Sequence, residues 1–283
     1  MKTVRFVQLT SAGADRWLEH DTYKDPNVIF STANGLHSTQ IAEWVIGVWL
    51  MVQHHFLDYA GFMKSAQWTK ANIFPIVDSP GLRMGILGYG AIGRQCARLA
   101  QALGMEVYAY TRSERSTPES RKDDSYAIPG TGDPDGLIPA KWFHGADKSA
   151  INGFLAQDLD VLVVSLPLTA STMYLLDKEQ FDVLSKKKTY LINIARGKHI
   201  RQEALIEALE QGKIKGAALD VADPEPLPSD HPLWKAPNLF MTPHVSWQTP
   251  YYWDRVLQIL ELNLDKLNAG EPLINVMNKK EHY

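Results

Sequence analysis

Three residues with side chains suited to acid–base chemistry and carboxylate binding each follow an apolar run of the chain. Arg196 ends YLINIAR, Glu225 lies in GAALDVADPEP, and His244 ends LFMTPH. An arginine can hold a carboxylate by two parallel hydrogen bonds, and a histidine can give a proton to a forming alkoxide. A glutamate beside the histidine favours the protonated ring and fixes its orientation. The set indicates reduction of a carbonyl compound that carries a carboxylate. A single histidine after a strand is more often structural, however, and DPEP alone can be a proline turn.

A glycine-rich turn precedes these residues and lies between a predicted strand and a predicted helix. Residues 88–93 read G-Y-G-A-I-G, which matches the dinucleotide-binding pattern G-x-G-x-x-G in its required context. The first glycine allows the tight turn, the second lets a pyrophosphate approach, and the third lets the helix pack closely on the strand. An ordinary strand–turn–helix with incidental glycines is the alternative. The predicted cofactor-binding residues of this turn are Gly88, Tyr89, Gly90, Ala91, Ile92 and Gly93.

The next predicted strand ends without the acidic residue that usually follows it. The chain reads Thr111-Arg112-Ser113 there, with Arg115 close behind. An acid at this place would bind the ribose hydroxyls and repel a 2′-phosphate, whereas an arginine offers planar donors to a phosphate. Arg112 could also be a solvated surface charge. We expect these residues to bind the 2′-phosphate, so NADP(H) is the predicted cofactor, with NAD(H) as a second possibility.

Strands and helices must alternate to bring these residues to one edge. The predicted strands are Arg83–Leu87, Glu106–Tyr110, Asp160–Leu166, Thr189–Ala195, Gly216–Val221 and Leu239–Thr242. Helices are expected between most of them, for example over Ala91–Leu103 and Arg201–Gln211. This alternation predicts an α/β fold with a doubly wound parallel sheet. The polar segment Ser116–Gly145 interrupts the rhythm, and we expect it to be a mobile surface insertion.

Segments on either side of this unit complete the chain. The stretch VRFVQLTSAGADRW predicts a strand, a turn and a helix start, and NVIFSTANG repeats the pattern weakly. A helix is expected from Ser38 to about Phe62, and its apolar surface on nearly all sides predicts burial in a core or against another subunit. Residues Asn72–Gly81 contain prolines and a glycine and are typical of a linker. An amphipathic helix is expected in YYWDRVLQILELNLDKLNAG.

Composition and charge exclude several classes of protein. The formal net charge is -3 and the pI is about 6.3, which favours neither nucleic acid nor an anionic membrane as a partner. Cys96 is the only cysteine, so an intramolecular disulfide and a cysteine-rich zinc site are impossible. We expect no metal site, no secretion signal and no membrane span, and a cytoplasmic location.

Several motifs together resemble one family. LGYGAIGRQ, SLPLTAST, LINIARGKHI, GAALDVADPEPLP and TPHVSW follow one another in this order, and VQLTSAGADRW and HSTQIAEWVIG precede them. They are similar to the signatures of the D-isomer-specific 2-hydroxyacid dehydrogenases. The stretch Thr111–Ser113 resembles the NADPH-preferring members that reduce glyoxylate, hydroxypyruvate or related 2-keto acids.

The resemblance implies a role for each matched position. Arg196 would bind the substrate carboxylate and carbonyl, His244 would be the general acid and base, and Glu225 would pair with His244. Asp220 would hold the nicotinamide carboxamide, and the helix Ser38–Phe62 would form a homodimer. Other cofactor-lining residues would be Leu166, Pro167, Thr172, Ile194 and Ala195. The backbone of Ser11, Ala12, Gly13 and Ala14 would face the substrate carboxylate.

The chain departs from the family pattern in two ways. Family members usually have several strand–helix units before the equivalent of VRFVQLTS, so a truncated flavodoxin-like substrate domain with an exposed sheet edge is expected. Ala222 stands where an aromatic residue is common. The expected domains are 1–75 (partial substrate domain with the dimerisation helix), 76–247 (Rossmann domain) and 248–283 (return helix). A non-catalytic nucleotide sensor is the alternative function, and the particular keto acid stays open.

Overall fold

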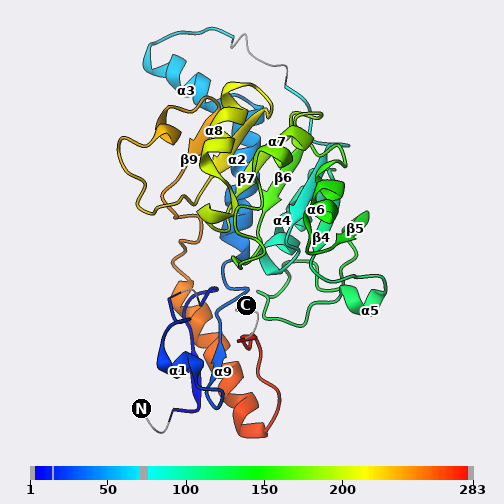
Figure 1. Ribbon diagram of the computed structural model, residues 1–283, viewed down its shortest axis with the longest axis vertical. Helices are drawn as coiled ribbons and strands as arrows, with labels where there is room; N and C mark the ends of the chain where they lie inside the picture. Colours follow the sequence, from blue (N-terminus) through cyan, green and yellow to red (C-terminus); the bar gives the residue numbers. More distant parts are fainter. Residues whose placement is uncertain (1–3, 15, 71–75, 280–283) are drawn as a thin grey trace.

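The computed structural model describes residues 4–14, 16–70 and 76–279 as two lobes of unequal size. Figure 1 shows the large lobe above and the small lobe below, and two stretches of chain join them, one before α2 and one after β9. The predicted linker Asn72–Gly81 falls partly on residues 71–75, which lie outside the described residues.

The large lobe is built on a sheet of seven parallel strands in the order β5-β4-β3-β6-β7-β8-β9. The sequence order reverses beside β3, as in a doubly wound Rossmann sheet. The predicted α/β class is therefore confirmed, and all six predicted strands are present: the strand Arg83–Leu87 has the predicted bounds, and the ends of the other five are shifted. The strands are β3 (Arg83–Leu87), β4 (Glu106–Thr111), β5 (Lys141–His144), β6 (Val161–Val164), β7 (Tyr190–Asn193), β8 (Gly216–Leu219) and β9 (Leu239–Met241).

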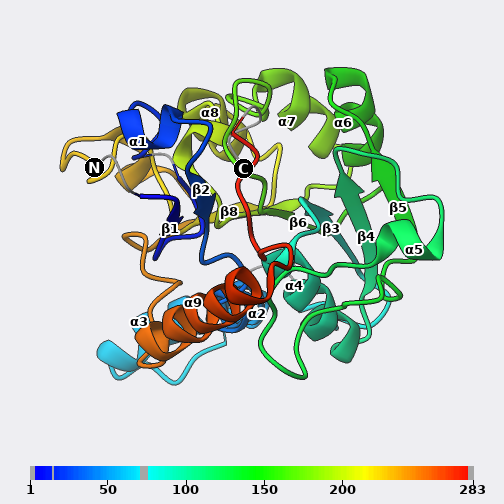
Figure 2. The ribbon, with the colours of Figure 1, turned by 90° about the horizontal axis from the view of Figure 1, so that it is seen from below.

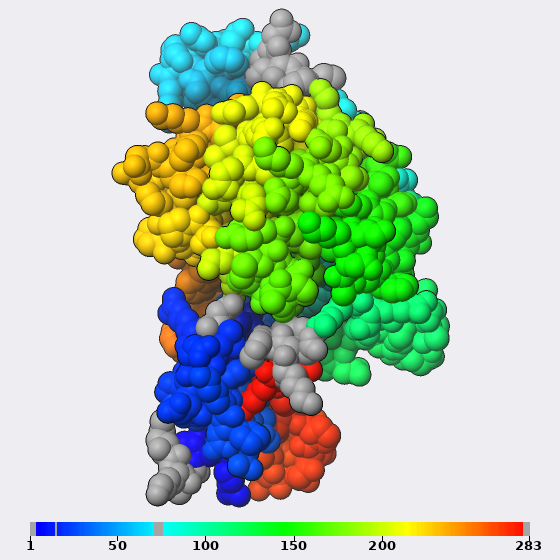
Figure 3. Space-filling model, in the orientation of Figure 1, coloured from blue at the N-terminus to red at the C-terminus, as the bar shows by residue number. Residues whose placement is uncertain are grey.

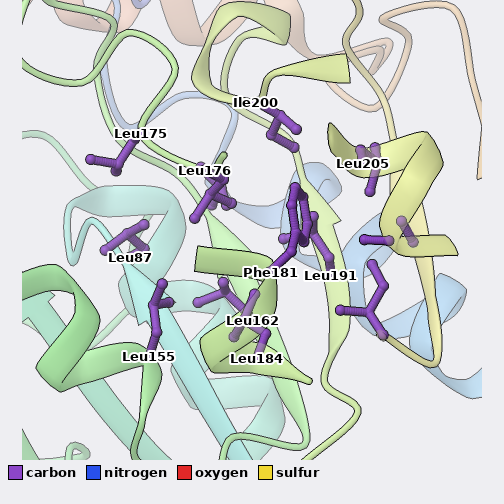
Figure 4. Close-up of a cluster of buried hydrophobic side chains, with 14 of the residues drawn as sticks. Leu87, Leu155, Leu162, Leu175, Leu176, Phe181, Leu184, Leu191, Ile200 and Leu205 are labelled. Atoms are coloured by element: carbon purple, nitrogen blue, oxygen red, sulfur yellow. The ribbon is translucent and has the colours of Figure 1, made fainter. Parts of the chain in front are cut away.

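Helices cover both faces of this sheet, as Figure 2 shows. They are α2 (Ser38–Gln53) and α4 (Ala91–Ala102) on one face, and α6 (Lys148–Leu155), α7 (Lys178–Leu184) and α8 (Gln202–Glu210) on the other. The large lobe also contains α3 (Phe56–Lys64) and α5 (Pro118–Arg121), which have no buried residues, and the 3₁₀ turns η1 (Gly197–His199) and η2 (Pro232–Lys235). Successive side chains of a strand point to opposite faces. In β6, Leu162 and Val164 thus join the core under α6, α7 and α8, whereas Val161 and Val163 join the core under α2 and α4. Figure 4 shows the first of these cores.

The helix expected over Ser38–Phe62 is two helices. Its first part, α2, packs on α4 within the large lobe, where Val45 and Trp49 are buried. It ends at Gln53, and His55 takes a left-handed φ of 55° before α3 begins. The residues at the break, His54 and His55, include no glycine or proline from which it could have been predicted. The packing of α2 places it with the nucleotide-binding unit, although the sequence assigned it to the segment 1–75.

The segment Ser116–Gly145, which we expected to be a mobile surface insertion, is folded onto the large lobe, and this packing argues against its mobility. It contains α5 and the edge strand β5, which pairs with β4. Asp133 is only 6% exposed, and its carboxylate accepts the hydroxyl of Tyr89 at 2.8 Å and the N–H of Leu137 at 3.0 Å. Arg94 of α4 pairs with Asp123 at 3.1 Å. These polar contacts hold the segment on the large lobe, although its low content of apolar residues had suggested that it would be mobile.

The small lobe combines both ends of the chain. It contains β1 (Phe6–Gln8), β2 (Ile29–Ser31), α1 (Asp21–Lys24) and α9 (Tyr252–Ala269). The described residues form a sheet of two parallel strands here, and the N–H of Met277 extends it by donating to Phe30 O at 2.8 Å. The lobes are held together by α9, where Arg255 donates to Leu36 O and Gln40 Oε1, each at 3.0 Å. In the space-filling view of Figure 3, the two ends of the chain, blue and red, lie together in the small lobe below the large one.

Candidate active site

The predicted functional residues meet at one edge of the large sheet. All neighbouring strands are parallel, so their carboxyl ends share that edge. The glycine turn follows β3, Thr111 ends β4, Arg196 follows β7, Asp220 follows β8 and His244 follows β9. Ligands of open α/β sheets bind at this edge, beside the strand where the order reverses.

The ring of His244 lies against the carboxylate of Glu225. Nδ1 of His244 is 2.8 Å from Oε2 of Glu225, and Oε1 accepts the N–H of Ala222 at 3.0 Å. An ionised carboxylate only accepts hydrogen bonds, so Nδ1 is the donor and Nε2 is left for another partner. His244 has a left-handed φ of 55°, and the indole of Trp247 donates to its backbone oxygen at 2.8 Å. The turn thereby fixes one orientation of the ring.

Arg196 is held by its backbone at the end of β7, two strands from β9 in the sheet. The side-chain amide of Asn193, which is fully buried, donates to Arg196 O at 3.0 Å, and Nη1 of Arg196 donates to Ala195 O at 2.8 Å. The next residue is Gly197, and a Cβ there would lie 2.1 Å from the carbonyl of Ala222. Only glycine permits this approach. Because Ala222 also binds Glu225, the Arg196 segment runs directly beside the loop that carries the glutamate.

Asp220 holds the loop that carries His244. Its side chain is 1% exposed, and its carboxylate accepts the N–H groups of Val245 at 2.9 Å and Ser246 at 3.0 Å, together with the hydroxyls of Thr242 and Ser246. These donors fill the roughly four acceptor positions of a carboxylate. Asp220 thus positions the histidine loop. The further role that the resemblance implies for Asp220, holding the nicotinamide carboxamide, stays a prediction.

The glycine turn has the shape that a pyrophosphate needs. Gly88 has a φ of +104°, and a Cβ there would lie 2.8 Å from the backbone of Ser165. A Cβ on Gly93 would lie 2.4 Å from Gly88 O, whereas nothing lies within 4 Å of a Cβ on Gly90. The helix α4 begins at Ala91 with Gly90 as its N-cap, so its first N–H groups and its positive end face the open side. The residues present therefore fit a dinucleotide.

Tyr89 contributes only its backbone to that turn. Its side chain is 5% exposed, packs edge-on against Trp142 and donates to Asp133. Burial, followed by the charge of Asp133, raises the pKa of the Tyr89 hydroxyl well above its ordinary value. The hydroxyl therefore stays a donor, and it ties the cofactor turn to the segment Ser116–Gly145.

The residues predicted to bind the 2′-phosphate divide into two groups. Arg112 and Ser113 are exposed after β4, and the hydroxyl of Thr111 donates to Ser113 O at 2.8 Å. Arg115 is half-buried, its guanidinium donates to Ser120 O, and its own carbonyl accepts from Arg121 at 2.9 Å. Arg115 thus shapes the α5 turn, and Arg112 is the stronger candidate for the phosphate.

The loop after β6, residues 166–172, carries further predicted cofactor contacts. It is closed by the hydroxyl of Thr172, which donates to Pro167 O at 2.8 Å and accepts the N–H of Thr169 at 2.8 Å. Ile194 and Ala195 are each 6% exposed next to Arg196. The cofactor-lining roles of Leu166, Pro167, Thr172, Ile194 and Ala195 stay predictions.

The small lobe supplies a wall to the same site. The hydroxyl of Tyr252 donates to Thr10 O, in the loop after β1, at 2.6 Å. The same loop contains the residues predicted to face the substrate, namely Ser11, Ala12, Gly13 and Ala14. The ring of Tyr252 packs on Trp247 with centroids 5.5 Å apart and on His37 with centroids 5.6 Å apart. Aromatic rings therefore join this loop to the segment that carries His244, which agrees with the predicted position of residues 11–14 but does not test their role.

A comparison with protein families matches residues 46–129 and 143–246 to the NAD-binding domain of the D-isomer specific 2-hydroxyacid dehydrogenases. The chain belongs to this family. The resemblance inferred from the motifs is confirmed, and the match spans α4, Arg196, Glu225 and His244. Its gap, residues 130–142, falls within the segment Ser116–Gly145 and contains Asp133, which binds Tyr89.

Curated relatives include reductases of small keto acids. A hydroxypyruvate reductase of Blautia hydrogenotrophica is 28% identical over 98% of this chain and 79% of its own length. The glyoxylate/hydroxypyruvate reductase A of Salmonella typhimurium is 28% identical over 100% of this chain and 83% of its own length.

Solved structures agree with the fold. The NADPH-dependent glyoxylate/hydroxypyruvate reductase of Sinorhizobium meliloti, in complex with NADP and sulfate, matches with a TM-score of 0.77 at 25% identity and covers 99% of this chain and 80% of its own. A family member from Xanthobacter autotrophicus, in complex with NADPH and MES, gives a TM-score of 0.77 at 28% identity and covers 99% of this chain and 79% of its own.

Neither a membrane span nor a metal cluster is present in the described part of the dehydrogenase. No helix over those residues is both long and apolar enough to cross a bilayer. Among the same residues, no three His, Cys, Asp or Glu side chains are grouped so that they could hold a metal ion.

Sequence reasoning missed His37, which lies in the wall of the dehydrogenase site. Its ring is 8% exposed, between Tyr252 and Trp247. Burial lowers the pKa of His37 to about 4, the backbone of Trp247 opposes this shift, and the charges of Arg255 and His244 add to it. The only signal in the sequence was a histidine directly before a helix, which is too common to single out.

His37 should make the stability of the dehydrogenase fall on acidification. The unfolded chain takes up a proton near the ordinary pKa of 6.5, whereas the folded chain does so only near 4. The contribution of neutral His37 to the free energy of unfolding is therefore complete above pH 6.5. This contribution is lost as the pH falls towards 4, by about 3 kcal/mol in total. Urea unfolding across this window should show a steeper loss in the wild type than in His37→Gln. Equal slopes in the two proteins would contradict the assignment, and His20→Gln, a change at an exposed position, is the control.

Proposed function

We propose that this chain is an NADP(H)-dependent reductase of small 2-keto acids of the glyoxylate and hydroxypyruvate type. The observation that carries the proposal is the His244–Glu225 pair at the sheet edge, beside Arg196 and on the same rim as the glycine turn. Reductases with these substrates, and structures that contain NADP or NADPH, are among its relatives.

Different residues of the site are proposed to bind the cofactor and the substrate. The backbone of Gly88–Gly93 and the first turn of α4 would hold the pyrophosphate, and Arg112 with Ser113 would receive the 2′-phosphate. When bound, the reduced nicotinamide supplies the hydride. Arg196 binds the substrate carboxylate by its guanidinium and thereby presents the keto carbon in one orientation.

His244 completes the reduction by giving a proton. Its Nδ1 donates to Glu225 at 2.8 Å, so the proton that leaves the ring is the one on Nε2. As the keto carbon accepts the hydride, this proton goes to the carbonyl oxygen, and the C=O bond becomes a C–OH group. A 2-keto acid, NADPH and one proton thus give a 2-hydroxy acid and NADP⁺. In the reverse direction Nε2 accepts the hydroxyl proton.

Consumption of NADPH tests the proposed function. Purified protein mixed with NADPH and either glyoxylate or hydroxypyruvate should lose absorbance at the nicotinamide band, and the matching 2-hydroxy acid should accumulate. Tight binding of NADPH without turnover of any small 2-keto acid would contradict the proposal and support the non-catalytic sensor.

Arg112 should set the choice between cofactors. Replacing it with alanine should raise the dissociation constant for NADPH by about tenfold to a hundredfold, because a charge-assisted bond to the 2′-phosphate is lost. The constant for NADH, which lacks that phosphate, should change little. Fluorescence titration with both cofactors measures the two constants, and the matched control is Arg98→Ala on the far part of α4. An unchanged ratio between NADPH and NADH would remove Arg112 from the cofactor site.

The proposal includes a homodimer formed through α3 and the residues after it. Exposed apolar side chains gather there, namely Phe56 (56%), Leu57 (50%), Met63 (80%) and Trp68 (105%). Figures 1 and 3 show α3 at the end of the molecule farthest from the small lobe. Patches of this kind mark interaction sites, and a second copy of the chain brings an identical patch. We also propose a reducing compartment such as the cytoplasm, because Cys96 is a buried free thiol.

Sedimentation should therefore give twice the mass of one chain. Trp68→Glu should shift the protein towards monomers, because a charge would have to be buried against the partner. Trp234→Glu, a change to another exposed tryptophan, is the matched control. A wild-type protein that sediments as a monomer at every concentration would contradict the dimer.

A further inference from the structure

His199 is a buried histidine that the proposed reaction does not use. It is the last residue of η1, its exposure is 0%, and its backbone N–H donates to Arg196 O at 3.3 Å. It therefore lies directly behind the residue proposed to bind the substrate.

Both ring nitrogens of His199 face carbonyl oxygens. Nδ1 lies 2.9 Å from Thr172 O, and Nε2 lies 3.0 Å from Leu166 O. These carbonyls stand at the two ends of the loop 166–172, which carries predicted cofactor contacts. The ring thus spans the base of that loop, and the N–H of Leu176 reinforces the connection by donating to His199 O at 3.0 Å.

The two contacts favour one protonation state of the ring. A neutral imidazole has one N–H and one lone pair, so it can donate to only one of these oxygens. Its other nitrogen would then direct a lone pair at a carbonyl oxygen about 3 Å away, and a buried acceptor would lose its partner, which is costly. A doubly protonated ring donates to both carbonyls and satisfies every polar atom of the contact.

We propose that His199 is a buried imidazolium that fixes the loop 166–172 to the Arg196 segment, as a positioning residue for cofactor and substrate. Its effect on binding rests on the proposed function, whereas its charge state does not. The ring touches neither ligand in this scheme. It sets the distance between the loop 166–172 and the Arg196 segment, because the loop accepts both hydrogen bonds of the ring and the Arg196 segment carries His199.

Ring nitrogen NMR tests the charge state without any ligand. In protein labelled with ¹⁵N-histidine near neutral pH, both ring nitrogens of His199 should resonate in the range of protonated nitrogens. His20 and His231 provide the internal reference, because each Nδ1 accepts a backbone N–H, from Thr22 at 3.1 Å and from Leu233 at 3.2 Å. Signals are assigned through backbone correlations and through their loss in His199→Gln. One unprotonated nitrogen on His199 would overturn the proposal.

Cofactor binding tests the positioning role. His199→Phe removes both donors and should raise the dissociation constant for NADPH by about tenfold or more, whereas His199→Gln keeps one donor and should have a smaller effect. Circular dichroism checks that both variants are folded, and His20→Gln is the control. Folded variants that bind NADPH like the wild type would overturn the positioning role. A wild type that shows the doubly protonated ring and binds NADPH, yet reduces no keto acid, would refute the proposed function and leave this inference intact.

Discussion

Replacing His244 with asparagine is expected to lower kcat for keto-acid reduction by about 10²–10⁴-fold, which is the usual contribution of a positioned general acid. The dissociation constant for NADPH should stay close to that of the wild type, because the side chain acts on the substrate oxygen. Stopped-flow single turnovers, which separate chemistry from binding, are the measurement. His231→Gln is the control, because this histidine has a structural role, as the N-cap of η2, and no proposed part in the reaction.

The partner of His244 makes this prediction sharper. Glu225 touches the ring through Nδ1 and touches the chain through Ala222. If it acts only through His244, Glu225→Gln should reduce kcat by itself but add little to the loss in His244→Asn. Additive losses in the double variant would show that Glu225 has a second role. A His244→Asn variant with nearly full kcat would refute the proton-transfer role.

Replacing Arg196 with glutamine is expected to lower kcat/KM for glyoxylate by about 10²–10³-fold, because a two-bond clamp on the carboxylate is lost. Arg196→Lys should recover only part of this loss, since an ammonium group cannot form two parallel hydrogen bonds. The backbone oxygen of Arg196, which accepts the amide of Asn193, is kept in both variants. Steady-state kinetics measure the effect, and thermal unfolding checks the fold.

A substrate without a carboxylate separates the clamp from a general loss of activity. Glycolaldehyde has a carbonyl group but no carboxylate, so the wild type should use it poorly and Arg196→Gln should use it about as well as the wild type does. An equal loss on glyoxylate and glycolaldehyde would show that Arg196 acts by some means other than the carboxylate.

Local patterns in the sequence were sufficient for the sheet and for the order of its functional residues. Runs such as VLVV and YLIN have the apolar character of strands covered on both faces, and the glycine turn lies at the required place between strand and helix. Because parallel strands share one carboxyl edge, residues that follow the strands had to meet there. The positions of Arg196, Glu225 and His244 on one rim could therefore be predicted from the order of the strands along the chain.

The segment Ser116–Gly145 shows where local patterns fail. Its edge strand β5 forms only by pairing with β4, and the propensity of so short a run depends on its neighbours. Asp133 and Asp123 read as loop residues, yet Tyr89 and Arg94 reach them from the glycine turn and α4. No pattern within the segment indicates these partners, because Tyr89 lies 44 residues before Asp133 and Arg94 also lies well before Asp123 in the chain.

The sequence by itself determined the fold class, the cofactor turn and the residues proposed for chemistry, because spacing and turn chemistry are local properties. Tertiary structure alone decided that Asp220 holds the histidine loop, that His37 is buried in the wall between the lobes, and that His199 spans the loop 166–172. The roles of Asp220 and His199 depend on which donors and acceptors packing brings within about 3 Å, and the burial of His37 depends on the rings of Trp247 and Tyr252. Residues far apart in the chain supply these contacts.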